Sequence, residues 1–399
     1  MKKSASNIMA GLFLLFICAM MACKKENSGA GPVITHVRNY AATPNDTLAQ
    51  AVIPGQWVVL IGQHFEDVVA ITFNGVAATF KGQMFSDTSA VVQVPAVIPF
   101  PTVPAEQLNV IQMVTTHGST SFTFNIAAPP PAITGVSNEN AQDGDSVYIY
   151  GTNLFFVQEL SFAGVKLEKF AANTDGTAIG FIQPHLTAGG IVKVVTKSGA
   201  DSTVYKVHDL TTGMLCDFDG VNPFSWGTNL ESSGADFPGG HGSYAILKNE
   251  VLPGGDGTWW GNQRSINTNE VQWLPVDSLQ AAVDGYAVKF EINVKGAWNG
   301  TSVYVIRNYD RAYLARYEPW LQADGATASY AANGWRTVTI PFTSFRTNDG
   351  KGTSAADLTA VAGSEAKGSI HIQTANFASS ATPTGFYAAI DNIRIVKIK

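Results

Sequence analysis

The sequence is poor in charge and in cysteine. Charged residues make up 14% of the 399 positions, against about 25% in ordinary soluble chains, and the formal net charge is −6. Nucleic-acid affinity depends on clustered Lys and Arg that contact phosphates, so this composition excludes a nucleic-acid partner. Of the three cysteines, two lie in the N-terminal segment, at positions 18 and 23. The one that is left cannot form a disulfide framework or a Cys-rich zinc site. The seven histidines are scattered along the chain, which argues against a multi-His metal centre.

The N-terminus carries an export signal. Lys2 and Lys3 precede an apolar run, Ile8 to Ala22, which is too short to cross a ~30 Å hydrocarbon core comfortably but suits a signal peptide. The run ends in Ala19-Met20-Met21-Ala22-Cys23, which resembles a lipoprotein lipobox. That resemblance implies a signal peptide over residues 1–22, a lipidated Cys23, and a flexible tether over residues 23–31. The alternative is an ordinary signal peptide cleaved nearby, with Cys23 incidental.

The remaining cysteine, Cys216, has no partner for a disulfide, because Cys18 leaves with the signal peptide and Cys23 is acylated. A lone Cys in a strand is usually a small buried hydrophobe, and we expect this role for Cys216.

An internal repeat organises the first half of the chain. Pro32-Val33-Ile34-Thr35-His36-Val37 recurs as Pro131-Ala132-Ile133-Thr134-Gly135-Val136, and Ile71–Val76 matches Leu160–Val165. Each copy consists of short β-branched segments interrupted by Gly and Pro, which is typical of a β-sandwich. The repeat predicts one domain over residues 32–127 and a second over residues 128–211. A short Pro-rich joint, Ala127 to Pro131, links them.

These motifs resemble the IPT/TIG immunoglobulin-like domains. The shared features are the opening Pro-x-Ile-x-x-Val, a Gly-x-x-Val-x-Ile-x-Gly segment at Gly144–Gly151, and the following Phe-x-Gly at Phe162–Gly164. The resemblance implies the fold and does not fix a function, because such modules serve in several kinds of protein. Together with the acidic charge and the lipid anchor, it favours a spacer role for both domains.

Residues 212–399 form a different domain. Seven of the eight Trp residues lie here, and strand patterns are clear. In the segment Tyr286 to Val294, alternation predicts that the apolar side chains point inward and that Lys289, Glu291 and Asn293 point outward. With many such segments and no convincing amphipathic helix, we predict an all-β chain. Its two Ig-like sandwiches are followed by a jelly-roll-type β-sandwich.

Several Trp residues of this domain lie in Gly-, Pro- and Asn-rich segments that read as surface loops. Trp226 lies in Asn222–Asn229, and Trp259 with Trp260 lies in Pro253–Asn262. An indole can cover the apolar face of a pyranose ring, so grouped loop Trp residues indicate a sugar-binding surface. Trp298, before an Asn299-Gly300 turn, is a further candidate. Core packing is the alternative for each, and it is the expected role of Trp273, Trp320 and Trp335.

Three segments of this domain resemble a known family: Arg316-Tyr317-Glu318-Pro319-Trp320, Gly334–Pro341, and the closing Ile390-Asp391-Asn392-Ile393-Arg394. They resemble the C-terminal xyloglucan-binding domain of the B-type surface glycan-binding proteins, lipoproteins of bacterial polysaccharide-utilisation systems with tandem immunoglobulin-like domains. The resemblance implies that Trp226, Trp259 and Trp260 hold a β-glucan. It also implies an outer-membrane protein facing the cell exterior, working with an uptake porin and a surface glycanase.

The alternatives are an adhesin for host glycan or protein, and a glycoside hydrolase with an unrecognised carboxylate pair. The sequence contains no Gly-x-Ser-x-Gly, His-Glu-x-x-His or P-loop motif, so a non-catalytic protein is the preferred interpretation. We expect it to be a monomer. No cofactor is expected. By analogy with other carbohydrate-binding sandwiches, Asp217, Asp219 and Asp391 are candidate ligands for a structural Ca²⁺. The alternative is that these carboxylates only cap turns.

Overall fold

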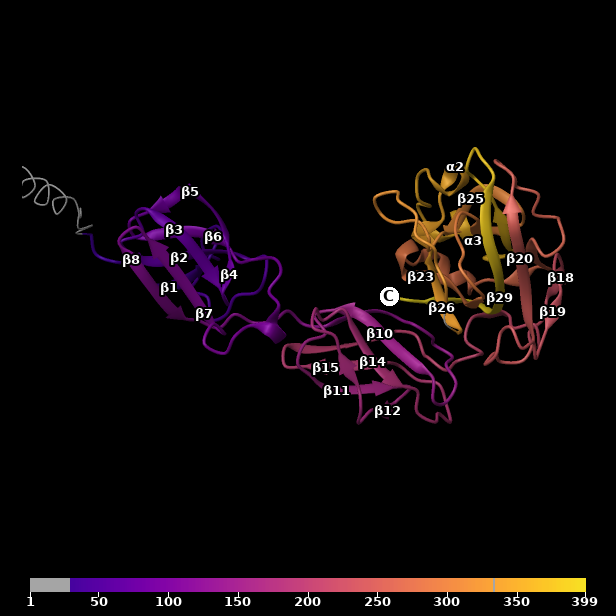
Figure 1. Ribbon diagram of the computed structural model, residues 1–399, viewed down its shortest axis with the longest axis horizontal. Helices are drawn as coiled ribbons and strands as arrows, with labels where there is room; N and C mark the ends of the chain where they lie inside the picture. The colour runs from indigo at the N-terminus through magenta and orange to yellow at the C-terminus, as the bar shows by residue number, and fades with distance from the viewer. Residues whose placement is uncertain (1–28, 333) are drawn as a thin grey trace, which may run out of the picture. The chain divides into compact units, whose positions relative to one another are not determined.

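The structure, a computed structural model, describes residues 29–332 and 334–399 and is built mainly of antiparallel strands (Figure 1). It divides into two compact units, the first ending at Pro129 and the second running from Pro130 to Lys399. The predicted signal peptide and Cys23 lie outside the described residues. Among the residues described, no helix combines the length and the apolar character needed to cross a bilayer.

The first unit is a sandwich of two four-stranded sheets, in the orders β1-β2-β6-β5 and β4-β3-β7-β8. Period-two alternation gives each sheet one apolar face, and Leu60 and Phe73 are fully buried between the two sheets. Its elements are β1 (Val33–Asn39), β2 (Trp57–Gln63), β3 (Val68–Phe73), β4 (Val76–Ala77), β5 (Thr79–Ser86), β6 (Ser89–Gln93), the 3₁₀ turn η1 (Phe100–Thr102), β7 (Val110–Thr115) and β8 (Gly118–Thr123).

The second unit begins with a sandwich of the same plan, in the orders β13-β14-β10-β9 and β12-β11-β15-β16. Val147 and Ile149 of one sheet and Leu160 and Phe162 of the other share one core. Its strands are β9 (Ala132–Val136), β10 (Ser146–Thr152), β11 (Val157–Phe162), β12 (Val165–Lys166), β13 (Ala171–Ala172), β14 (Ala178–Ile182), β15 (Lys193–Thr196) and β16 (Gly199–Ser202).

The rest of the second unit is a larger sandwich. One sheet has the order β19-β20-β29-β23-β26 with β17 also paired to β29, and the other has the order β18-β21-β28-β24-β25. Figure 1 shows the long strands β20 and β29 side by side, as their pairing requires. The strands are β17 (Met214–Cys216), β18 (Phe224–Trp226), β19 (Leu230–Glu231), β20 (Tyr244–Leu252), β21 (Ser265–Thr268), β22 (Val271–Gln272), β23 (Tyr286–Val294), β24 (Ser302–Arg307), β25 (Asp310–Tyr317), β26 (Arg336–Pro341), β27 (Lys367–Gly368), β28 (Ile370–Ala375) and β29 (Thr382–Lys397).

In the described part of this sandwich, helical structure is limited to short turns. These are η2 (Val276–Gln280), η3 (Val283–Gly285), η4 (Phe342–Ser344), α2 (Thr347–Gly350) and α3 (Leu358–Ala362). Phe290 and Ile292 from β23 pack with Val305 from β24 and Ile372 from β28 in one core. Cys216 is fully buried beside them, and burial raises the pKa of its thiol to about 12. The all-β prediction and the buried role of Cys216 are confirmed.

One prediction for β23 is wrong. The side chains expected to face solvent, Lys289, Glu291 and Asn293, are at most 5% exposed. The face that carries Lys289 and Glu291 is covered by the segment Ser137–Asn140, which follows β9 of the preceding sandwich and is itself buried. The backbone N–H of Thr337 donates to the carbonyl of Ser137 (2.9 Å), and the N–H of Glu139 donates to the Thr337 hydroxyl (2.8 Å).

Four charged side chains meet at this junction, defined here as the contact between Ser137–Asn140 and strands β23, β26 and β29. Arg394 donates to both Glu139 (2.9 Å) and Glu291 (2.8 Å), and Lys289 donates to Glu139. The Lys289 ammonium also lies 3.3 Å from the centre of the Tyr205 ring. Burial alone would lower the pKa of Arg394, but Glu291 and Glu139 hold it raised. The two positive and two negative charges balance one another away from water.

Candidate binding site

Trp226 ends the short strand β18, where it pairs with Asn267 of β21. The Asn267 side chain donates to the Trp226 carbonyl (3.2 Å) and to the Ser265 hydroxyl (2.7 Å). These bonds fix the backbone of Trp226 while its side chain stays 40% exposed. The prediction of a surface indole at this position is confirmed.

Trp259 and Trp260 lie in the loop between β20 and β21, and a buried ion pair holds this loop. Arg264, only 9% exposed, donates to Asp256 (3.1 Å) and to the Thr374 hydroxyl of β28 (3.1 Å). Asp256 also accepts from the backbone N–H of Thr258 (2.8 Å). Burial would raise the pKa of Asp256, but these hydrogen bonds and the Arg264 charge keep it lowered. The loop is therefore anchored to the sheet beneath it.

The three indoles form a contiguous group, called here the tryptophan cluster (Trp226, Trp259 and Trp260). Trp259 lies in the middle, with its ring 5.7 Å from Trp226 at 44° and 5.6 Å from Trp260 at 87°. Trp260 is the most exposed, at 62%. Because the rings are angled rather than coplanar, the cluster offers faces in several directions instead of one flat surface.

Trp298 does not belong to this cluster, and its prediction as a glycan-binding residue is wrong. It is fully buried, its indole N–H donates to the carbonyl of Thr301 (2.9 Å), and its ring packs 4.6 Å from Phe386. Its backbone forms an antiparallel bridge with Tyr330, through two hydrogen bonds of 2.8 and 2.9 Å. Trp273 and Trp320 are also core residues, and Trp335 packs against Tyr244 at 5.6 Å.

An aromatic residue that the sequence analysis missed adjoins the cluster. The ring of Tyr309, in the turn between β24 and β25, lies 5.0 Å from Trp259 at 28° and is 40% exposed. In the sequence, Asn308 and Tyr309 lie between two segments with strand patterns, which indicates a turn. Nothing in this pair indicates that Tyr309 lies close to residues 226 and 259.

The carboxylates considered for calcium have other roles. Among the described residues, no group of three or more His, Cys, Asp or Glu side chains is arranged to hold a metal ion. Asp217 accepts from the backbone N–H groups of Asp219 and Val221 (2.9 and 2.8 Å), and Asp219 accepts from that of Ser243 (2.9 Å). Asp391 is buried and accepts from the N–H of Asn392 (2.7 Å). These are turn and capping roles, the alternative considered from the sequence.

Asp391 makes the stability of this domain depend on pH. Burial, with smaller contributions from Glu291, Asp219 and Asp217, raises its pKa from 3.8 to about 8. A carboxyl whose pKa is raised by folding contributes fully below its unfolded pKa, and the contribution is lost as pH rises through its folded pKa. We expect Asp391→Asn to gain in melting temperature relative to the wild type as pH rises from 5 to 8. The difference in the free energy of unfolding between the variant and the wild type changes by up to about 1.4 kcal/mol per pH unit. Parallel melting curves over this range would contradict the assignment.

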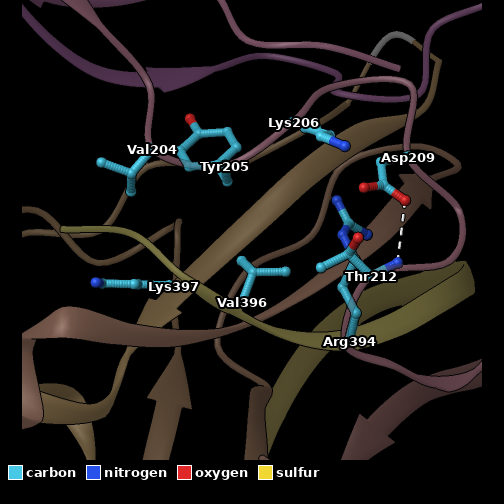
Figure 2. A pocket seen from close by; sticks show the side chains of 8 residues that line it. All are labelled: Val204, Tyr205, Lys206, Asp209, Thr212, Arg394, Val396 and Lys397. Atoms are coloured by element: carbon cyan, nitrogen blue, oxygen red, sulfur yellow. Dashed lines mark hydrogen bonds between the residues drawn. The ribbon is translucent and has the colours of Figure 1, made fainter. Parts of the chain in front are cut away.

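A small cavity of about 150 Å³ lies where residues 204–212 meet the end of β29 (Figure 2). Its walls include Tyr205, Asp209 and Arg394, and the Thr212 N–H donates to Asp209 (3.0 Å), the dashed line in Figure 2. Arg394 is already paired with two carboxylates at the junction. The cavity is thus part of the packing between the two sandwiches of the second unit.

Comparison with known families shows which class of protein this domain resembles. Residues 207–397 match the family model described as surface glycan-binding protein B xyloglucan binding domain. The C-terminal domain is similar to that family, and the resemblance predicted from the sequence to the B-type surface glycan-binding proteins is confirmed. Proteins of this class are non-catalytic. The carboxylates of Asp256, Glu291 and Glu318 are each paired with an arginine.

Two solved structures and one curated protein are similar to this chain. The solved surface glycan-binding protein PbSGBP-B from Prevotella bryantii is 20% identical, with a TM-score of 0.65 over 93% of this chain and 100% of that one, which establishes the fold. An SGBP-B from a complex xyloglucan utilization locus in Bacteroides uniformis is 17% identical, with a TM-score of 0.49 over 92% and 99% of the two chains. An IPT/TIG domain-containing protein from Bacteroides ovatus is 26% identical over 149 residues, 37% of this chain but only 30% of that protein.

Proposed function

We propose that the protein binds a plant-type β-glucan, xyloglucan or a mixed-linkage glucan, through the tryptophan cluster. The observation that carries the proposal is the cluster itself. The end of β18 and the loop between β20 and β21 bring three indoles together on the surface of a domain similar to a xyloglucan-binding family. Exposed aromatic groups of this kind are uncommon without a binding role.

The chemistry of stacking supports this ligand class. The C–H groups of a β-linked pyranose form an apolar face that an indole can cover, leaving the hydroxyls to water or polar neighbours. Each stack contributes about 1–2 kcal/mol from buried apolar area. After the cost of ordering the sugar chain, two or three stacks correspond to a Kd of about 1 μM to 1 mM. Such binding retains a polymer without trapping it.

The cellular role we propose is retention of polysaccharide at the outer surface of a bacterium. Cys23 would carry the lipid anchor in the outer membrane, and the two Ig-like domains would act as spacers. Bound glucan would be held near a surface glycanase and an outer-membrane uptake porin. The lipobox-like Ala22-Cys23 sequence and the family of the C-terminal domain support this role.

Affinity electrophoresis of residues 24–399 tests the binding function directly. Native gels containing xyloglucan, mixed-linkage β-glucan, mannan, xylan or starch are compared with a gel without polysaccharide. We expect retardation by one or two β-glucans and by none of the others. An unchanged mobility in every gel would refute β-glucan binding and favour an adhesin. Release of reducing ends from a retarding polysaccharide would refute the non-catalytic role.

The anchor is tested by Cys23→Ala in the full chain. We expect the wild type in the outer-membrane fraction and accessible to protease added to whole cells, because acylation requires the Cys thiol. The variant is expected in the soluble fraction. Membrane association that survives the substitution would show that another segment anchors the protein.

A further inference from the structure

Tyr309 occupies a backbone position that an aromatic residue rarely adopts. Arg307 and Asp310 pair across the β24–β25 hairpin, so Asn308 and Tyr309 form a two-residue turn, with φ of 51° and 57°. Such turns require positive φ at both central positions, where Asn suits the first and Gly is usual at the second. A bulky side chain at the second position is strained. The contacts of the ring must therefore offset this strain, since Gly at this position would be free of it.

What the ring provides is a connection between the sheet and the tryptophan cluster. It stacks on His371 of β28, with ring centres 3.7 Å apart at 22°, and on Trp259 at 5.0 Å. Its hydroxyl lies beside the Trp226 side chain, and the indole N–H, which can only donate, partly offsets the burial that raises the pKa of Tyr309. Tyr309 thus stacks on Trp259 of the β20–β21 loop and lies beside Trp226 at the end of β18.

The base of this stack is rigid. His371 is fully buried, and its Nε2 lies 2.7 Å from the Ser369 hydroxyl. The Asn308 side chain accepts from the Ser369 N–H (2.8 Å) and hydroxyl (3.1 Å), and the Asn308 N–H donates to the Ser369 carbonyl (3.1 Å). Burial lowers the pKa of His371 to about 4, so this imidazole is neutral at physiological pH. The turn is tied to β28 at several points.

We propose that Tyr309 is a positioning residue of the glycan site, holding Trp259 and Trp226 in their binding orientation before the sugar arrives. This inference rests on the proposed function of the cluster and adds a residue to it. Side chains that are already ordered lose less freedom on binding, which increases affinity. The strained turn is the means by which the ring reaches both indoles.

Tyr309→Gly and Tyr309→Phe test the role of the ring. Gly suits the positive φ, so we expect its melting temperature to equal or exceed that of the wild type, while glucan affinity falls about tenfold or more. The near-UV circular dichroism of the free protein should weaken as the indoles become mobile. Phe keeps the ring and its stacking and should retain binding within about threefold, because only the hydroxyl is lost. A lower melting temperature for Tyr309→Gly would instead indicate a purely structural role and overturn the proposal.

A double-mutant cycle with Trp259→Ala identifies the path of the effect. If Tyr309 acts through Trp259, Tyr309→Gly adds little loss of affinity in the Trp259→Ala background. Wild-type affinity in Tyr309→Gly, with loss in Trp260→Ala, would overturn this inference and leave the proposed function intact. If the wild type binds no glucan, the proposed function fails. The near-UV spectrum then still decides whether Tyr309 orders the indoles.

Discussion

Replacing Glu139 with Gln is expected to lower the stability of the second unit by about 3–5 kcal/mol, the cost of leaving a buried charge without its partner. Lys289 is 1% exposed and donates to Glu139, and Arg394 uses Glu139 as its second carboxylate. Gln keeps the shape of the side chain and removes its charge. The junction would then hold two cations against one carboxylate, Glu291.

Thermal unfolding of the mature chain measures this effect. At about 2–4 °C per kcal/mol, we expect the transition of the second unit to fall by roughly 6 °C or more. Asp284→Asn is the matched control, because its 2.8 Å pair with Lys399 is exposed on both sides and should contribute at most about 1 kcal/mol. An equal, small shift in both variants would mean that the buried charges contribute no net stability.

The junction also marks the limit of what the sequence could predict. Alternation along Tyr286–Val294 correctly assigned Val288, Phe290 and Ile292 to the main core. It could not say that a second domain covers the opposite face, because a polar face buried against charged partners and a polar face in water have the same pattern. Lys289 and Glu291 are buried because Glu139, some 150 residues earlier, completes the charge balance.

The candidate site could be predicted only in part, because local composition indicates exposure but not contacts between residues distant in sequence. Loop composition correctly indicated that Trp226 and Trp260 are exposed, since Gly, Pro and Asn mark segments that lie on the surface. The same signal failed at Trp298, where the turn residues follow an indole that points inward. Tyr309 was missed because its contacts with Trp259 and His371 depend on strand order in the sheet, which no local pattern encodes.

Trp260→Ala and Trp226→Ala are each expected to weaken glucan binding about five- to thirtyfold without changing the melting temperature. Trp260 is 62% exposed and Trp226 is 40% exposed, so their removal opens no cavity in the core. Loss of one stack of about 1–2 kcal/mol corresponds to a change in Kd of roughly five- to thirtyfold. Isothermal titration with oligosaccharides of the glucan that retards the wild type measures this change.

Trp57→Ala provides the matched control for these variants. Trp57 lies on β2 of the first unit, and its side chain is 40% exposed, the same fraction as that of Trp226. Its removal deletes the same indole area from the surface of a predicted spacer domain, so affinity should stay at the wild-type value. Equal losses in Trp57→Ala and Trp226→Ala would indicate non-specific adsorption to indoles. Loss confined to Trp226→Ala and Trp260→Ala, with all melting temperatures unchanged, would assign the binding surface to the angled rings of the tryptophan cluster.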